Sequence, residues 1–146
     1  RKMDQEMNHI YSGSCHCQNI RFEFHSDFKF LKFSPRACDC DFCLKHGASY
    51  VSDPDGILRI KISDENEVNR YEHGSKTAEF LVCRKCGVFV AVTYTEEKTV
   101  YAGINSNTVK ENNRFGKKEI VSPKKLNPGE KVDRWKEIWF QDVCID

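Results

Sequence analysis

Six consecutive residues, Cys38-Asp39-Cys40-Asp41-Phe42-Cys43, carry three thiols, and we expect the rest of the chain to be organised around them. A structural zinc site takes four protein ligands, whereas a reactive zinc site takes three and keeps one position for water or substrate. This run supplies three ligands. The other cysteines of the chain therefore decide between a closed structural site and a site open to a small molecule.

Four further cysteines form two close pairs, Cys15-x-Cys17 and Cys83-x-x-Cys86, and the second pair is followed by Gly87. Such short spacings are geometrically poor for disulfides, especially Cys-x-Cys. A Cys-x-x-Cys-Gly turn is typical of a zinc knuckle. The two pairs together supply the four thiolates of one closed site. Cys38, Cys40 and Cys43 then remain as a separate three-thiolate site.

Two interpretations of the three-thiolate site stay open. In the first, one more side chain completes a second structural zinc site, and the candidates are His46, His16, Asp39, Asp41 and Cys144. In the second, the site is open. Zinc with three thiolates has a net charge of about −1, so it activates water poorly and suits a thiol ligand, which it deprotonates. That chemistry is the addition of a thiolate to an electrophile such as an aldehyde, or its reversal.

Composition narrows the functional class. The chain has 146 residues, 39% of them hydrophobic, and a net charge of +1, so no strong field favours nucleic acid or an acidic membrane as partner. It has no apolar run as long as a membrane span and no secretion signal.

Eight cysteines without such a signal indicate a reducing, intracellular location, the cytoplasm or alternatively the nucleus. Because the chain opens with Arg1 rather than Met, we expect a processed form or a fragment.

The hydrophobic pattern predicts a mainly β, antiparallel fold with one short C-terminal helix. We expect a flexible segment over residues 1–10 and a single zinc-binding domain over 11–146. The predicted strands cover residues 20–24, 28–33, 48–51, 57–62, 68–71, 88–94 and 99–104, the first two as a hairpin. The helix is expected over 133–140, with Asp133 as N-cap. The basic stretch 110–134 is expected to form a lid over the site or an interaction surface.

Three spaced motifs carry a resemblance to a known family. They are Gly13-x-Cys15-His16-Cys17, Cys38-x-Cys40-x-x-Cys43-x-x-x-Gly47 and Cys83-x-x-Cys86-Gly87. Their order and spacing resemble the glutathione-dependent formaldehyde-activating enzyme family, to which centromere protein V also belongs. The resemblance implies a β-tent fold, a structural zinc on Cys15, Cys17, Cys83 and Cys86, and a catalytic zinc on Cys38, Cys40 and Cys43. It also implies a carbon–sulfur lyase that joins glutathione and formaldehyde reversibly as S-(hydroxymethyl)glutathione.

The chain departs from the family pattern at two positions. Gln18 stands where the family usually has Gly, and Asp41 where it usually has Ser. Carboxylates beside the three thiols would either disfavour an anionic substrate or accept a proton, and we expect Asp41 or His46 to move the proton.

Basic residues also flank the thiols and are candidates to hold substrate carboxylates, namely Arg36, Lys45, Arg84 and Lys85. Two alternatives to an enzyme remain at this point. One is a non-catalytic zinc-binding interaction module of the centromere protein V type. The other is a redox or alkylation sensor in which Cys38, Cys40 and Cys43 hold no metal and react with oxidants.

Overall fold

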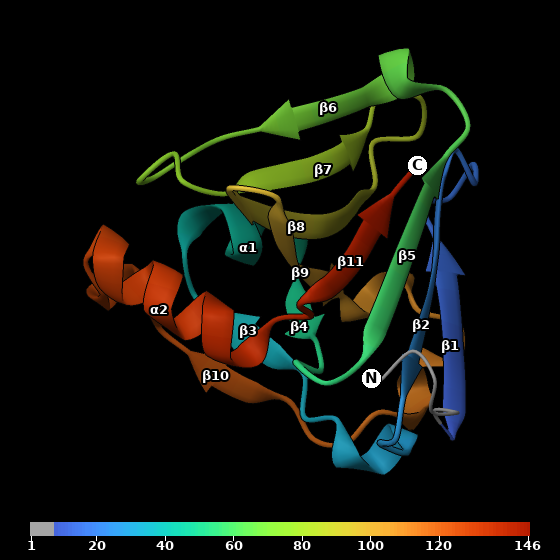
Figure 1. The fold of residues 1–146 in the computed structure, drawn as a ribbon, viewed down its shortest axis with the longest axis horizontal. Coiled ribbons are helices and arrows are strands. Elements are labelled where there is room, and N and C mark those ends of the chain that lie inside the picture. The colour runs from blue at the N-terminus through green and yellow to red at the C-terminus, as the bar shows by residue number, and fades with distance from the viewer. Residues whose placement is uncertain (1–7) are drawn as a thin grey trace.

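A computed structural model describes residues 8–146 and shows two sheets and two helices (Figure 1). The smaller sheet has the order β1 (His9–Ser14), β2 (Ile20–Ser26), β5 (Ile57–Ile62), β11 (Asp142–Ile145). The larger has the order β10 (Glu119–Val121), β3 (Arg36–Cys38), β4 (Ser49–Val51), β9 (Thr99–Asn105), β8 (Phe89–Glu96), β7 (Glu79–Cys83), β6 (Val68–Tyr71). The helices are α1 (Asp41–His46) and α2 (Pro128–Ile138).

The prediction of a mainly β fold is confirmed, and most neighbouring strands are antiparallel. Two pairs are parallel: β10 joins β3, and β11 joins β5. Both strands come late in the chain and add to the edge of a sheet that earlier strands have built (Figure 1). Parallel pairing needs a long connection between the two strands, and the large sequence separation provides it.

Two layers of core lie on the two faces of the larger sheet. Phe24, Leu58 and Ile60 fill the space between the sheets, because β2 and β5 alternate apolar and polar residues. The run from Phe89 to Thr93 in β8 is buried throughout, as predicted for a central strand. Its residues divide between the inter-sheet core and a second cluster, which α2 covers. Of the predicted strands, 57–62 and 68–71 coincide with β5 and β6.

The predicted strand over residues 28–33 is wrong. That stretch contains a 3-10 turn, Phe30–Lys32, and the rings of Phe30 and Phe33 pack on Tyr11. The hairpin partner of β2 is instead β1, in the register His9 to Ser26 through Ser14 to Arg21. Thus the last two residues of the segment expected to be flexible lie in β1, and residues 1–7 lie outside the described part.

The C-terminal helix begins earlier than predicted. Asn127 is its N-cap and not Asp133, and a capping box joins Asn127 to Glu130 with Pro128 in the first turn. The rings of Trp135 and Trp139 stack with their centroids 4.8 Å apart, on the face that packs against the larger sheet. In the described part of the chain, no helix is long and apolar enough to cross a membrane.

Candidate metal centres

The first sulfur cluster unites the two close cysteine pairs. The Sγ atoms of Cys15, Cys17, Cys83 and Cys86 all lie within 4.8 Å of one another. Two of the separations are 3.8 Å, from Cys15 to Cys17, and 3.5 Å, from Cys17 to Cys83. Zinc–sulfur bonds of about 2.3 Å give a tetrahedron with edges of roughly 3.8 Å, so the donor set fits a tetrahedral zinc ion.

Each pair sits in the turn of a hairpin. The Cys15 N–H donates to the Ile20 carbonyl and the Cys83 N–H to the Val88 carbonyl, both at 3.0 Å. The Ile20 N–H also donates to Cys15 Sγ at 3.3 Å. These are the features of zinc knuckles, in which backbone N–H groups face the sulfurs. The residue after each pair has a left-handed backbone, with φ of 68° at Gln18 and 77° at Gly87.

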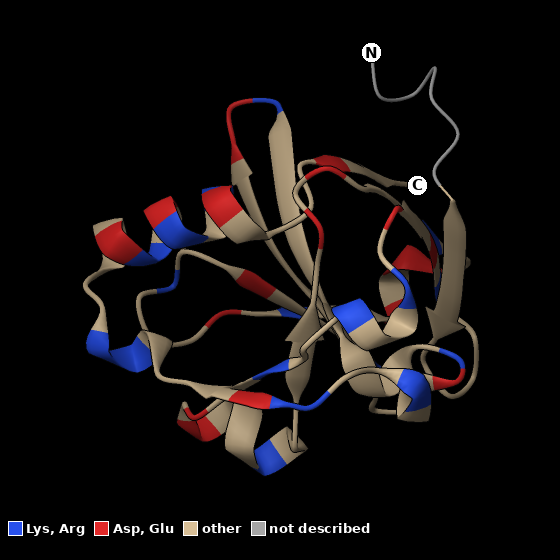
Figure 2. Ribbon diagram, turned by 90° about the horizontal axis from the view of Figure 1, so that it is seen from below, with Lys and Arg blue, Asp and Glu red and all other residues tan. Residues whose placement is uncertain are grey.

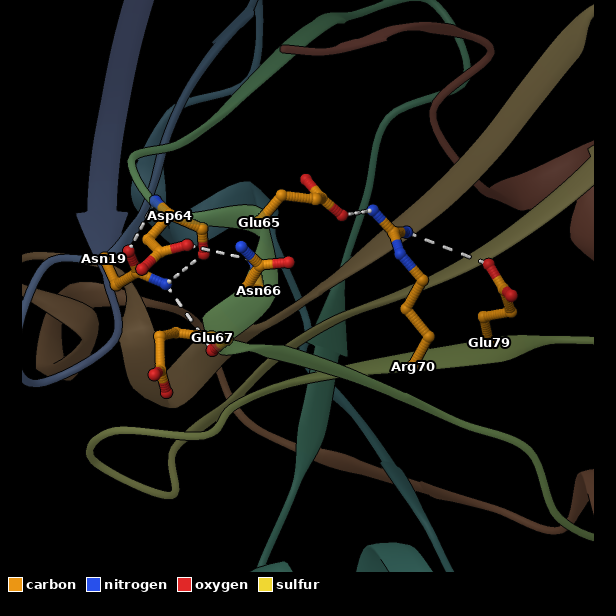
Figure 3. Close-up of polar contacts among 7 residues, drawn as sticks. All are labelled: Asn19, Asp64, Glu65, Asn66, Glu67, Arg70 and Glu79. Carbon is orange, nitrogen blue, oxygen red and sulfur yellow. Dashed lines mark hydrogen bonds and ion pairs between the residues drawn. The ribbon is translucent and has the colours of Figure 1, made fainter.

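A buried amide ties the two knuckles together (Figure 3). Asn19, directly after the first knuckle, donates from Nδ2 to the Asp64 carbonyl at 3.1 Å and accepts from the Asp64 N–H at 2.9 Å. Its Nδ2 also lies 3.5 Å from the Glu67 carbonyl, which accepts from the N–H of Arg84 in the second knuckle. The 3-10 turn Glu65–Glu67 thus bridges the two halves of the four-cysteine cluster.

The thiols of this cluster are in electrostatic conflict. Burial raises the pKa of Cys15 to about 12. At Cys86, burial opposes ionisation, but N–H groups of Cys17 and Val88 and the neighbouring thiols outweigh it and lower the pKa to about 6. The protein alone therefore does not ionise all four thiols at neutral pH. A divalent cation removes the conflict, because it favours the thiolate form at every ligand.

The second sulfur cluster comes from the run Cys38–Cys43. Cys38 ends β3, Cys40 caps α1 and Cys43 lies in its first turn, and the three Sγ atoms lie within 4.8 Å of one another. Hydrogen bonds from Cys38 and Cys43 lower the pKa of Cys40 to about 2. Among the described residues, no other Cys, His, Asp or Glu joins this group. None of the five candidates for a fourth protein ligand is therefore in place.

The three thiols lie in the wall of a cavity of about 100 Å³. Apolar side chains make up much of the wall, including Phe80, Val92, Trp135 and Trp139. Four cations line it, from β3, from the stretch before α2 and from α2 itself: Arg36, Lys124, Lys131 and Arg134. Figure 2 shows the basic turn Pro123–Lys125 next to the start of α2. Part of the predicted lid segment thus borders this cavity.

No carboxylate from the described residues lines the cavity. Asp39 points to the loop after β10, where its Oδ2 accepts a hydrogen bond from Ser122 Oγ at 2.6 Å and lies 3.9 Å from Lys124 Nζ. Asp41 is exposed at the start of α1. Arg36 is half-buried, and burial followed by the charge of Arg134 lowers its pKa to about 10. The cavity is therefore cationic, and an anionic substrate suits it.

The structure separates the predicted proton carriers from the cavity. Neither Asp41 nor His46 lines it, and the exposed His46 ring packs on Phe42 and Phe89. His73 does line it, and its buried Nε2 has no hydrogen-bond partner among residues 8–146. The roles of Asp41 and His46 stay predictions.

Sequence reasoning missed Tyr50, whose hydroxyl lies 2.9 Å from Cys43 Sγ, and it gave the two tryptophans only a packing role. No sequence motif identifies Tyr50 as a partner of the thiols. It reaches them only because β4 pairs with β3 in the folded protein.

Comparisons with known proteins bear on the fold and on the family. A solved structure of a Rhodobacter sphaeroides protein shares the fold, with a TM-score of 0.53 and 23% identity, over 82% of this chain and 93% of that one. No curated protein matches. The sequence pattern of the glutathione-dependent formaldehyde-activating enzyme family matches residues 10–125, which include all seven clustered cysteines. The chain therefore belongs to the glutathione-dependent formaldehyde-activating enzyme family.

Proposed function

We propose that this protein is a zinc-dependent carbon–sulfur lyase-like enzyme that forms or cleaves a thiol–aldehyde adduct such as S-(hydroxymethyl)glutathione. One observation carries the proposal: the three-thiol cluster lies in the wall of a cationic cavity, while the four-thiol cluster is braced between two hairpins. The first arrangement suits exchange of a ligand. The second suits a structural metal.

The reaction balances without a redox partner. The thiol sulfur bonds to the aldehyde carbon, the π pair of the carbonyl moves to oxygen, and that oxygen takes the proton that the thiol has lost. Zinc held by Cys38, Cys40 and Cys43 would supply a Lewis acid that keeps the substrate sulfur as thiolate at neutral pH. Cleavage runs through the same steps in reverse.

The chain's own residues would bind the substrate and exclude water. Guanidinium groups such as Arg36 and Arg134 form charge-assisted bonds with carboxylates, and glutathione carries two of these. The two tryptophans and Phe80 present apolar surface beside the thiols, so that the adduct is shielded from bulk water. We place this activity in a reducing compartment, the cytoplasm, where clustered thiols stay reduced and available to a metal.

Substitution of one cysteine tests the proposal. We expect Cys40→Ser to lower the zinc content from two ions per chain to one, and to abolish the exchange of formaldehyde between its hydrate and the glutathione adduct. Exchange spectroscopy by NMR measures that rate. The variant should remain folded, because the four-thiol cluster is intact.

Cys144→Ser is the matched control, since Cys144 is exposed in β11 and belongs to neither cluster. A Cys40→Ser protein that keeps both its second zinc ion and the exchange rate would contradict the proposal.

A further inference from the structure

The second sulfur cluster has a hydrogen-bond partner outside its own cysteines. The hydroxyl of Tyr50 lies 2.9 Å from Cys43 Sγ, and both side chains are buried, with 8% and 2% of their surfaces exposed. Among the described residues, no other side chain outside the cluster forms a hydrogen bond with its three sulfurs. The contact therefore distinguishes Cys43 from the other two thiols.

The direction of this hydrogen bond follows from the chemistry of the pair. A cysteine that ligates a metal is a thiolate, which accepts hydrogen bonds and donates none. A phenol keeps its proton at neutral pH, since its ordinary pKa is about 10, and it can therefore donate. Tyr50 thus donates to Cys43, and a hydrogen bond to an anion is short and about twice as strong as a neutral one.

The scaffold fixes the donor in place. Tyr50 lies in β4, opposite Arg36 of β3 and Asn105 of β9. Its ring packs edge-on against Phe89 of β8, with the centroids 6.1 Å apart. Because β3 also ends at Cys38, one strand pair holds both a sulfur ligand and the donor to another ligand. A hydrogen bond set by sheet register persists without any induced movement.

We propose that Tyr50 is a positioning residue of the three-thiol site, whose hydroxyl withdraws charge from Cys43 and so strengthens the binding of an incoming thiolate. Three thiolates make a zinc ion electron-rich and therefore a weak acceptor for a fourth. A donor on one of them partly reverses this effect, and partners of metal ligands commonly change affinity or activity by 10–100-fold. The inference rests on the proposed function for the metal at the three-thiol site and for the thiol that binds it.

Tyr50→Phe tests the inference, because it removes the hydroxyl and keeps the ring. Cobalt(II) replaces zinc, and the difference spectrum against cobalt-loaded Cys40→Ser isolates the sulfur-to-cobalt charge-transfer bands of the three-thiol site. We expect Tyr50→Phe to shift these bands, to weaken glutathione binding by about tenfold and to keep two metal ions per chain. Tyr101→Phe is the control, since Tyr101 also lies in the larger sheet but does not line the cavity.

Each outcome is decisive. Bands and glutathione affinity that match those of the parent protein would overturn the inference, as would the loss of one metal ion from Tyr50→Phe, which would make the residue essential to the site itself. If glutathione leaves the bands of the parent protein unchanged, the proposed function fails. The band shift in Tyr50→Phe then still decides whether the hydroxyl withdraws charge from Cys43.

Discussion

Gln18 stands where the family resemblance leads us to expect glycine, and the backbone shows why glycine would suit this position. Its φ is 68°, close to the 77° of Gly87 at the equivalent place in the other knuckle. A residue with a Cβ atom pays about 1 kcal/mol for this left-handed conformation. The departure from the family pattern thus affects the strain of the first knuckle and leaves the sulfur ligands unchanged.

We therefore expect Gln18→Gly to stabilise the zinc-loaded protein by about 0.5–1 kcal/mol, since relief of strain exceeds the added freedom of the unfolded chain. Chemical denaturation measures the free energy of unfolding. A variant less stable than the parent would show that the Gln18 side chain makes contacts that outweigh the strain.

Among single residues, the ligand groups could be predicted and their surroundings could not. Sequence spacing alone divides seven cysteines into sets of four and three, because neighbours in a turn stay neighbours in space. The cavity is different. Arg36, Tyr50 and Trp135 belong to three separate elements, and only tertiary packing brings them beside the thiols. For the same reason the sequence did not show that Asp39 turns toward Ser122 and that neither Asp39 nor Asp41 lines the cavity; their effect on the site stays a prediction.

At the scale of elements, alternation of apolar and polar residues marked β2 and β5 correctly but failed over residues 28–33, and polar composition was misleading. The bounds of β5 and β6 were predicted to the residue, and β5 has the period-two pattern of a half-buried strand. β1 was missed because only Tyr11 is buried along it. The first turn of α2 was missed because it lies in the basic stretch 110–134, although Asn127 and Glu130 form a capping box there.

The link between the two knuckles depends on one element, the turn Glu65–Glu67, which Asn19 holds (Figure 3). We expect Asn19→Ala to destabilise the protein by about 2–3 kcal/mol, because it leaves buried backbone groups without partners. The variant should also lose zinc from the four-thiol cluster to a chelator faster than the parent does.

Asn66→Ala provides the matched control, since Asn66 is exposed in the same turn and its backbone N–H, rather than its side chain, bonds to Asp64. Equal stability of the two variants would contradict a bracing role for Asn19.

At the scale of the whole molecule, the two sulfur clusters differ in how far apart their cysteines lie in the sequence and in what surrounds them. The four-thiol cluster joins residues near the start and the middle of the chain, so a metal there closes a long loop and adds to folding stability. The three-thiol cluster spans six residues and cannot contribute in this way. Its position beside a cationic, aromatic cavity instead suits recognition of an anionic thiol.

The central claim is that the three-thiol cluster holds a metal whose fourth ligand comes from outside the chain. The most direct test is a crystal structure of the zinc-loaded protein with glutathione, with anomalous data collected at the zinc edge. We predict two anomalous peaks, one among Cys15, Cys17, Cys83 and Cys86, and one on Cys38, Cys40 and Cys43 with the glutathione sulfur completing the tetrahedron. A single peak at the four-thiol cluster, or a protein side chain as fourth ligand at the three-thiol cluster, would contradict the claim.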